Sequence, residues 1–117
     1  MGLKTTADLL REARDLITPF RGWTQGELAR DAHGRPCSPN SPAAVCWCGT
    51  GAAMKVDGKA VGESAFHGLC RAAAKHNIII PRLNDGGVTL DGLPPHEAIL
   101  RLYDEAIALA EANHDAP

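Results

Sequence analysis

The sequence has little of several features that would indicate a particular function. Only five of its 117 residues are aromatic, and 12 Lys and Arg nearly balance 14 Asp and Glu, which gives a formal net charge of −2. Domains that bind polyanions are usually strongly basic, so this balance argues against a general nucleic-acid-binding protein. No apolar run approaches the roughly 20 residues of a membrane-spanning helix, and no apolar block typical of a signal peptide is present. We therefore expect a cytoplasmic protein with reduced thiols.

The length predicts one domain, residues 1–117, with an ordered core over about 5–112. Hydrophobic residues make up 44% of the chain, but 19 residues are alanine, which buries little apolar surface. The core must then consist of closely packed helices around a few large side chains. Trp23 and Trp47 are the expected anchors.

Hydrophobic spacing predicts an all-α bundle of about five helices. We expect Thr5 and Asp8 to cap the first helix, and Ser41 with Pro42 to start the third and most buried one, in which Gly49 allows a neighbour to approach closely. The expected helices cover residues 6–18, 25–32, 43–56, 62–76 and about 95–112. Residues 78–80 are expected to be a short extended segment, and residues 83–87 a turn.

The start signal of the expected second helix is a capping box formed by Thr24 and Glu27. In this pattern the Thr hydroxyl accepts a bond from the Glu amide, and the Glu carboxylate accepts one from the Thr amide. Trp23 and Leu28 would form the hydrophobic staple on either side of the cap. The pattern predicts that the chain turns helical directly after Trp23.

Several ordered motifs occur together along the chain. They are Trp23-Thr24-Gln25-Gly26, Ala29-Arg30-Asp31, Gly34, Ala44-Val45-Cys46-Trp47-Cys48 followed by Gly51-Ala52, Asn84-Asp85 and Ala106-Ile107. Together they resemble a family of small bacterial and phage domains of unknown function, the DUF6197-like domains, from about residue 9 to 110. The sequence departs from the pattern at Leu83, where we expect an aromatic residue. The resemblance implies a single cytoplasmic domain with an accessory role and no assigned activity.

The four cysteines are candidate metal ligands. Residues two apart in a helix point about 200° from each other, so Cys46 and Cys48 would not converge on one ion within the expected helix. The Cys-x-x-Cys spacing of structural zinc sites is also absent, which favours buried packing of the thiols. The weak zinc candidates are Cys37, Cys46, Cys48, His67 and Cys70, with His33 as a further ligand. A redox pair of Cys37 with Cys46 or Cys48 stays open.

A thiol nucleophile is the enzyme hypothesis. Cys48 would be activated if it lay at a helix N-terminus with His67 or His76 beside it as a base. Gln25 or the amides of residues 49–51 would then stabilise an oxyanion. Asn84 and Asp85 either present an amide and a carboxylate to a ligand or organise their own turn, and the turn is the commoner case.

The sequence favours a non-catalytic binding or inhibitory module, because no catalytic or cofactor set stands out. We expect a small protein of the kind that phages or mobile elements carry, for example against a defence complex, acting through a protein partner without a cofactor. A homodimer is compatible with the sequence. The alternative is a thiol-dependent enzyme or metal-binding protein centred on Cys46 and Cys48. A weaker one is nucleic-acid binding through Arg11, Arg14, Arg21, Arg30 and Arg35, which acidic residues interrupt. The motif residues expected to bind or to organise the fold are Trp23, Thr24, Gln25, Glu27, Trp47, Asn84 and Asp85.

Overall fold

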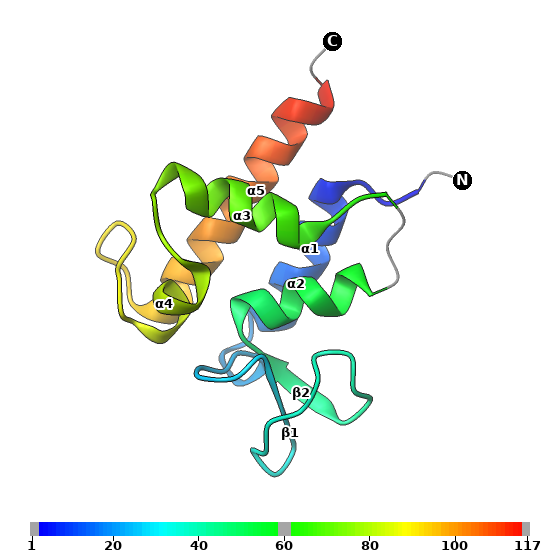
Figure 1. The fold of residues 1–117 in the computed structure, drawn as a ribbon, viewed down its shortest axis with the longest axis vertical. Helices are drawn as coiled ribbons and strands as arrows, with labels where there is room; N and C mark the ends of the chain where they lie inside the picture. Colours follow the sequence, from blue (N-terminus) through cyan, green and yellow to red (C-terminus); the bar gives the residue numbers. More distant parts are fainter. Residues whose placement is uncertain (1–2, 59–61, 116–117) are drawn as a thin grey trace.

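A computed structural model describes residues 3–58 and 62–115 of the chain. The elements in chain order are α1 (Thr6–Ile17), a short 3₁₀ helix η1 (Phe20–Gly22), β1 (Ala29–Asp31), β2 (Ala44–Trp47), α2 (Gly49–Asp57), α3 (Ala65–Lys75), α4 (Ile80–Asp85) and α5 (Pro95–Asp115) (Figure 1). The mostly helical class is confirmed, with a two-stranded antiparallel sheet in addition to five α-helices in the described part. None of these helices is long and apolar enough to cross a membrane.

Helix α1 begins as the sequence predicts. The Thr5 hydroxyl accepts a hydrogen bond from the Asp8 amide (3.1 Å), and the Asp8 carboxylate accepts one from the Thr5 amide (3.0 Å). Two backbone donors at the helix N-terminus are therefore satisfied. The negative charge of the Asp8 carboxylate also interacts favourably with the positive end of the helix dipole. The buried side of the helix includes Leu9, Ala13 and Ile17, which packs α1 onto α2, α3 and α5.

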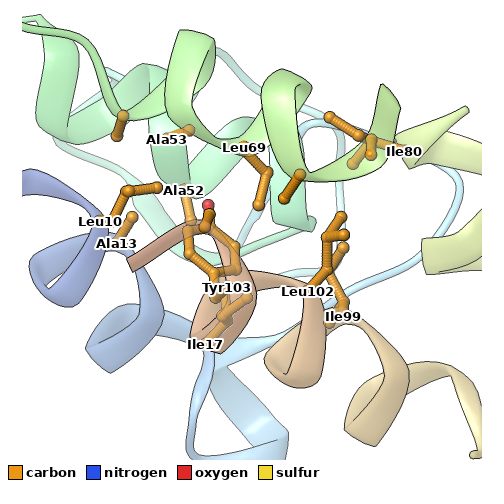
Figure 2. Packing of buried hydrophobic residues seen from close by; sticks show 14 of the residues in the cluster. Leu10, Ala13, Ile17, Ala52, Ala53, Leu69, Ile80, Ile99, Leu102 and Tyr103 are labelled. Atoms are coloured by element: carbon orange, nitrogen blue, oxygen red, sulfur yellow. The ribbon is translucent and has the colours of Figure 1, made fainter. Parts of the chain in front are cut away.

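The core lies between α1, α2, α3 and α5 (Figures 1 and 2). Its largest fully buried side chain is Tyr103 of α5, whose ring lies among aliphatic side chains of α1, α2 and α5 (Figure 2). Trp47 is buried, as expected, whereas Trp23 is only partly buried and packs against the edge of the core. Tyr103 rather than Trp23 is therefore the second large aromatic anchor.

The predicted helix over residues 25–32 is wrong. Gly26 adopts a φ of +81°, which a right-handed helix does not contain, and the chain then enters β1. The Thr24 hydroxyl accepts a bond from Nε of Arg30 (3.0 Å) instead of capping a helix, and the same guanidinium donates to the Gln25 carbonyl (3.1 Å). Leu28 is 40% exposed, so no staple forms. These tertiary contacts of Arg30 hold the segment as a loop, which local spacing alone does not reveal.

The predicted helix over residues 43–56 is wrong over residues 43–48. Residues Ala44–Trp47 form β2, in which Trp47 pairs with Ala29 and Cys46 with Arg30. The Ser41 hydroxyl accepts a bond from the Ala43 amide within a turn, and the helix begins only after Cys48. Valine and tryptophan favour strands, and their pairing with β1 outweighs the helical spacing of the small residues.

Residues 78–87 also differ from the prediction. Instead of an extended segment and a turn, they contain α4, with Ile79 as its N-cap and Pro81 in its first turn, where a missing backbone donor is tolerated. Gly86, at a φ of +89°, ends the helix. Asn84 and Asp85 consequently lie in the last turn of a helix. The prediction for α3 was close, although that helix starts at Ala65 after a Ser64 cap.

Candidate functional site

The two glycines at the start of α2 allow close packing there. A Cβ atom on Gly49 would lie 2.5 Å from Cγ1 of Ile99, and one on Gly51 would lie 1.9 Å from the backbone oxygen of Leu28. Both distances are too short for any larger residue without movement of the neighbour. This confirms that the glycines permit the close approach of a neighbouring segment. It also brings the loop before β1 against the N-terminus of α2.

Asn84 connects this helix start to the rest of the motif residues. Its side chain is 1% exposed. Its Oδ1 accepts hydrogen bonds from the indole Nε1 of Trp23 (2.8 Å) and from the Gly49 amide (2.9 Å). Its Nδ2 donates to the Thr24 carbonyl (3.0 Å) and to Oδ1 of Asp85 (3.1 Å). One buried amide thus joins three segments that are far apart in sequence.

The remaining motif residues extend the same network. Gln25 donates through Nε2 to the Asn84 carbonyl (3.0 Å), and Oδ1 of Asp85 accepts a bond from the Gly26 amide (3.0 Å). The Thr24 amide donates to the Trp47 carbonyl (3.0 Å). The structure therefore brings together all the motif residues named from the sequence except Glu27, whose side chain takes no part in these bonds. These bonds hold the fold together and leave most of the polar groups occupied.

Cys48 is the N-cap of α2, which is the position that the thiol hypothesis required. Its Sγ accepts a hydrogen bond from the Gly51 amide (3.3 Å). Burial raises the pKa of the thiol above its ordinary value and outweighs the opposing bonds from the amides of Gly51 and Thr50, and the nearby charge of Asp85 raises it further. The thiol is therefore held protonated at neutral pH, and the glycine amides that would stabilise an oxyanion are already bonded.

The other histidine and cysteine candidates lie apart from Cys48. His67 is exposed on α3 and lines a separate cavity of about 550 Å³ between α1, α3 and α5. Cys70, also on α3, is partly buried, and burial raises its pKa. His76 contacts Glu105 of α5 through Nε2 (2.5 Å). In the described structure none of these side chains pairs with the Cys48 thiol.

Cys37 and Cys46 lie on opposite sides of β1. The Cys37 amide donates to the Ala29 carbonyl on one side, and Cys46 pairs with Arg30 on the other. Because β1 lies between them, their Cα atoms are separated by two strand spacings, roughly 9–10 Å. The Cα atoms of a disulfide lie no more than roughly 7 Å apart, so these two cysteines cannot form one. Across residues 3–58 and 62–115, no three His, Cys, Asp or Glu side chains cluster closely enough to hold a metal ion.

Most of the early arginines contact groups of the chain itself. Arg11 pairs with Glu111, and Nε of Arg14 lies 2.8 Å from Asp104, so both arginines join α1 to α5. Arg30 holds the loop after Trp23. These three arginines are therefore bonded to other groups of the domain.

A second feature was not apparent from the sequence. Phe20 is 72% exposed, and its ring packs edge-on against His96 (5.3 Å between centroids) and beside Trp23 (5.7 Å). The rings of Trp23 and His96 are 4.9 Å apart. Hydrogen bonds hold two of the three rings in place. The indole of Trp23 donates to Asn84, and Nε2 of His96 lies 2.6 Å from the Ile17 carbonyl. We call Phe20, Trp23 and His96 the surface aromatic cluster.

A small pocket is lined in part by residues of the motif network. It has a volume of about 220 Å³ at the start of α2. Its lining consists of Gly26, Glu27, Leu28, Cys48, Thr50, Pro81, Asn84 and Asp85. We call it the α2 pocket. Several of the motif residues named from the sequence thus line one cavity, which sequence spacing could not indicate because α4 was not foreseen.

The fold and the site together define a small, mostly helical domain in which the motif residues named from the sequence bond to one another beside one small pocket. The model of the family described as "Family of unknown function (DUF6197)" matches residues 1–109, and the chain belongs to this family. Comparisons with curated proteins and with solved structures gave no match. The resemblance noted in the motifs is therefore confirmed at the level of the family.

Proposed function

We propose that this domain is a non-catalytic cytoplasmic binding module that acts through a protein partner, with the surface aromatic cluster at the centre of the contact. The observation that carries the proposal is the position of Phe20. It is one of only five aromatic residues in the chain, and 72% of it is exposed. A large apolar side chain that stays exposed to water contributes little to the stability of the fold. A chain that has few such side chains therefore exposes one for another reason.

The geometry of the cluster supports a role in binding. Aromatic residues are enriched among the few interface residues that supply most of the binding energy. The ring of Phe20 rests on Trp23 and His96, which are themselves held by hydrogen bonds. A side chain that is ordered before binding loses less conformational entropy when the partner docks.

The environment of Cys48 favours binding over thiol catalysis. A nucleophilic cysteine needs a lowered pKa and an accessible sulfur, whereas this thiol is buried and its pKa is raised. Inhibition, for example of a host or phage defence complex, is one form that such binding takes, and the resemblance to phage and bacterial domains supports that form.

The test is site-specific photo-crosslinking in the source cell. A photoreactive phenylalanine analogue replaces Phe20, and a matched control carries the same analogue at Val45, which is 50% exposed on β2. We expect one defined protein adduct from position 20 and none of that protein from position 45. The purified partner should then bind Phe20→Ala at least about fivefold more weakly than the unaltered domain, since truncation of a central interface aromatic costs over about 1 kcal/mol.

Two results would overturn the proposal. The first is equal binding of the partner by Phe20→Ala and by the unaltered domain, or the same adduct from both positions. The second is an enzymatic turnover that disappears in Cys48→Ala while the thermal unfolding curve stays cooperative, because that result would assign the chemistry to the thiol.

A further inference from the structure

Asp-Gly pairs occur at three places in the chain, residues 57–58, 85–86 and 91–92. Such a pair can rearrange without an enzyme. The backbone nitrogen of the glycine attacks the carboxyl carbon of the aspartate side chain, a C–N bond forms, and the amide proton leaves with the carboxyl hydroxyl as water. Water then opens the resulting five-membered succinimide at the original backbone carbonyl, which produces isoaspartate. One water is released and one is taken up, so the rearrangement needs no other reactant.

The fold holds the first of these pairs in place. The carboxylate of Asp57 accepts hydrogen bonds from the Ser64 hydroxyl (3.0 Å) and from the Ala65 amide (2.7 Å). The Gly58 amide donates to the Met54 carbonyl (3.1 Å) at the end of α2. The rearrangement requires the glycine nitrogen and the aspartate carboxyl to turn toward each other. These bonds prevent that movement unless the local structure opens.

The second pair is held in a similar way. Oδ1 of Asp85 accepts bonds from the Gly26 amide (3.0 Å) and from the side chain of Asn84 (3.1 Å). The Gly86 amide donates to the Leu83 carbonyl (3.3 Å) at the end of α4. Both reacting groups of this pair are therefore bonded within the domain.

The third pair lies at the centre of an exposed turn between α4 and α5. The Leu93 amide donates to the Leu90 carbonyl (3.0 Å) and closes the turn, in which Asp91 has a φ of +53° and Gly92 a φ of +70°. The left-handed region is uncommon for residues other than glycine. The Gly92 amide has no hydrogen-bond partner among the described groups, and a Cβ atom on Gly92 would meet nothing within 4 Å. The nitrogen of this pair is therefore free to react.

The carboxylate of the third pair is restrained only at the surface. Within the described residues Asp91 has one side-chain partner, Nη1 of Arg101 on α5, at 2.7 Å. The side chain of Arg101 is 46% exposed and that of Asp91 is 53% exposed. An exposed ion pair of this kind is weak, because water solvates both charges. It slows the approach of the carboxyl carbon to the Gly92 nitrogen but does not block it.

We propose that Asp91 is a modification site, the position at which this domain converts aspartate to isoaspartate. In the product the peptide bond runs through the former side-chain carboxyl, so the connection between α4 and α5 gains one backbone atom. The free carboxylate is then attached directly to Cα, and the ion pair with Arg101 is lost. The fold thus directs to one turn a reaction that the sequence permits at three places.

The experiment measures isoaspartate in the full domain during several weeks of incubation at neutral pH and body temperature. Peptide mapping with electron-transfer fragmentation distinguishes isoaspartate from aspartate at each of the three positions. We expect isoaspartate to form at Asp91 at least about tenfold faster than at Asp57 or Asp85, since those two react only when the local structure opens. In urea the three rates should become similar. Equal rates in the folded domain, or no isoaspartate at Asp91, would overturn the proposal.

Variants of the turn test the assignment and the role of the ion pair. Asp91→Glu keeps the charge but would need a six-membered ring, so we expect it to abolish the product at this position. Arg101→Met removes the ion pair and should raise the rate about two- to fivefold, as for the loss of up to ~1 kcal/mol. The control is Arg35→Met, which removes the ion pair with Asp31 and should leave the rate at Asp91 unchanged.

Two outcomes of the variants would contradict the reasoning. Isoaspartate in that peptide of Asp91→Glu at the level of the unaltered domain would refute the assignment of the position. An equal rate in Arg101→Met and Arg35→Met would refute the restraining role of Arg101. Neither result bears on the surface aromatic cluster, because the measurement needs no partner.

Discussion

Replacement of Asn84 by alanine tests the interpretation that the motif residues named from the sequence form a scaffold. The asparagine side chain makes four hydrogen bonds from a position that is 1% exposed. Truncation removes both ends of the amide and leaves three buried or partly buried partners without it: the Trp23 indole N–H, the Gly49 amide and the Thr24 carbonyl. The methyl group of alanine can replace none of these bonds.

The size of the effect follows from these three groups. A buried polar group that loses its partner costs about 1–3 kcal/mol. Three such groups predict a loss of at least about 3 kcal/mol in the free energy of unfolding, out of the 5–15 kcal/mol that stabilise a typical domain. For a chain of this length the loss corresponds to a fall in Tm of roughly 10 °C or more.

The assay is urea unfolding followed by circular dichroism and by tryptophan fluorescence, with Asn40→Ala as the control. Asn40 is exposed, and its replacement should change the free energy of unfolding by less than about 0.5 kcal/mol. In the Asn84 variant the indole N–H signal of Trp23 should also exchange faster with solvent, because its acceptor is gone. A loss below about 1 kcal/mol would refute the scaffold interpretation and free Asn84 for a role in ligand binding.

Three further predictions concern the same region. Gly51→Ala should lower the free energy of unfolding in urea by more than about 2 kcal/mol, because its Cβ would lie 1.9 Å from a backbone oxygen. The control Gly87→Ala, whose Cβ would lie 3.5 Å from the nearest atom, should change this free energy by less than about 0.5 kcal/mol. Similar losses in the two variants would contradict the close packing at Gly51. Iodoacetamide at neutral pH should alkylate Cys48 far more slowly than Cys46 in the folded protein, since burial raises the pKa of Cys48. In urea the two cysteines should react at similar rates. Rapid alkylation of Cys48 in the folded protein would show an activated thiol. Burial raises the pKa of Tyr103 well above its ordinary value, so the unfolded state ionises first, and the stability that is present below about pH 10 is lost as the pH rises further. Tyr103→Phe should lose about 1 kcal/mol of stability at neutral pH, because the tyrosine hydroxyl donates a hydrogen bond to the Gly49 carbonyl (2.6 Å), and it should flatten the decline of stability at alkaline pH. An equally steep decline in this variant would contradict the prediction.

The sequence predicted those elements whose signals are local. The Thr5 and Asp8 capping box lies within four residues, and the spacing of the apolar residues of α1 and α5 repeats over several turns, so both helices appear almost where they were expected. The close approach at Gly49 was also foreseen, because a glycine inside a buried helix needs such a reason.

The capping box of Thr24 and Glu27 shows why other local signals failed. The residue types were correct for a helix start, but the Thr24 hydroxyl is bonded by Arg30, and Arg30 is itself placed by the pairing of β1 with β2. That pairing joins segments more than ten residues apart. A pattern read over four residues contains no information about it, so the competing tertiary arrangement decides the outcome.

The error at residues 44–48 had the largest chemical consequence. Within a helix, Cys46 and Cys48 would both be side chains of one element. In the structure the helix starts after Cys48, which makes the thiol an N-cap and allows Asn84 to bond the Gly49 amide beside it. A helix start of this kind lowers the pKa of an exposed cysteine, but here burial and the nearby Asp85 act in the opposite direction and prevail. The displaced helix start therefore meets the geometric condition for a reactive thiol, because Cys48 is the N-cap, but it does not meet the electrostatic one, because burial and Asp85 raise the pKa of the thiol.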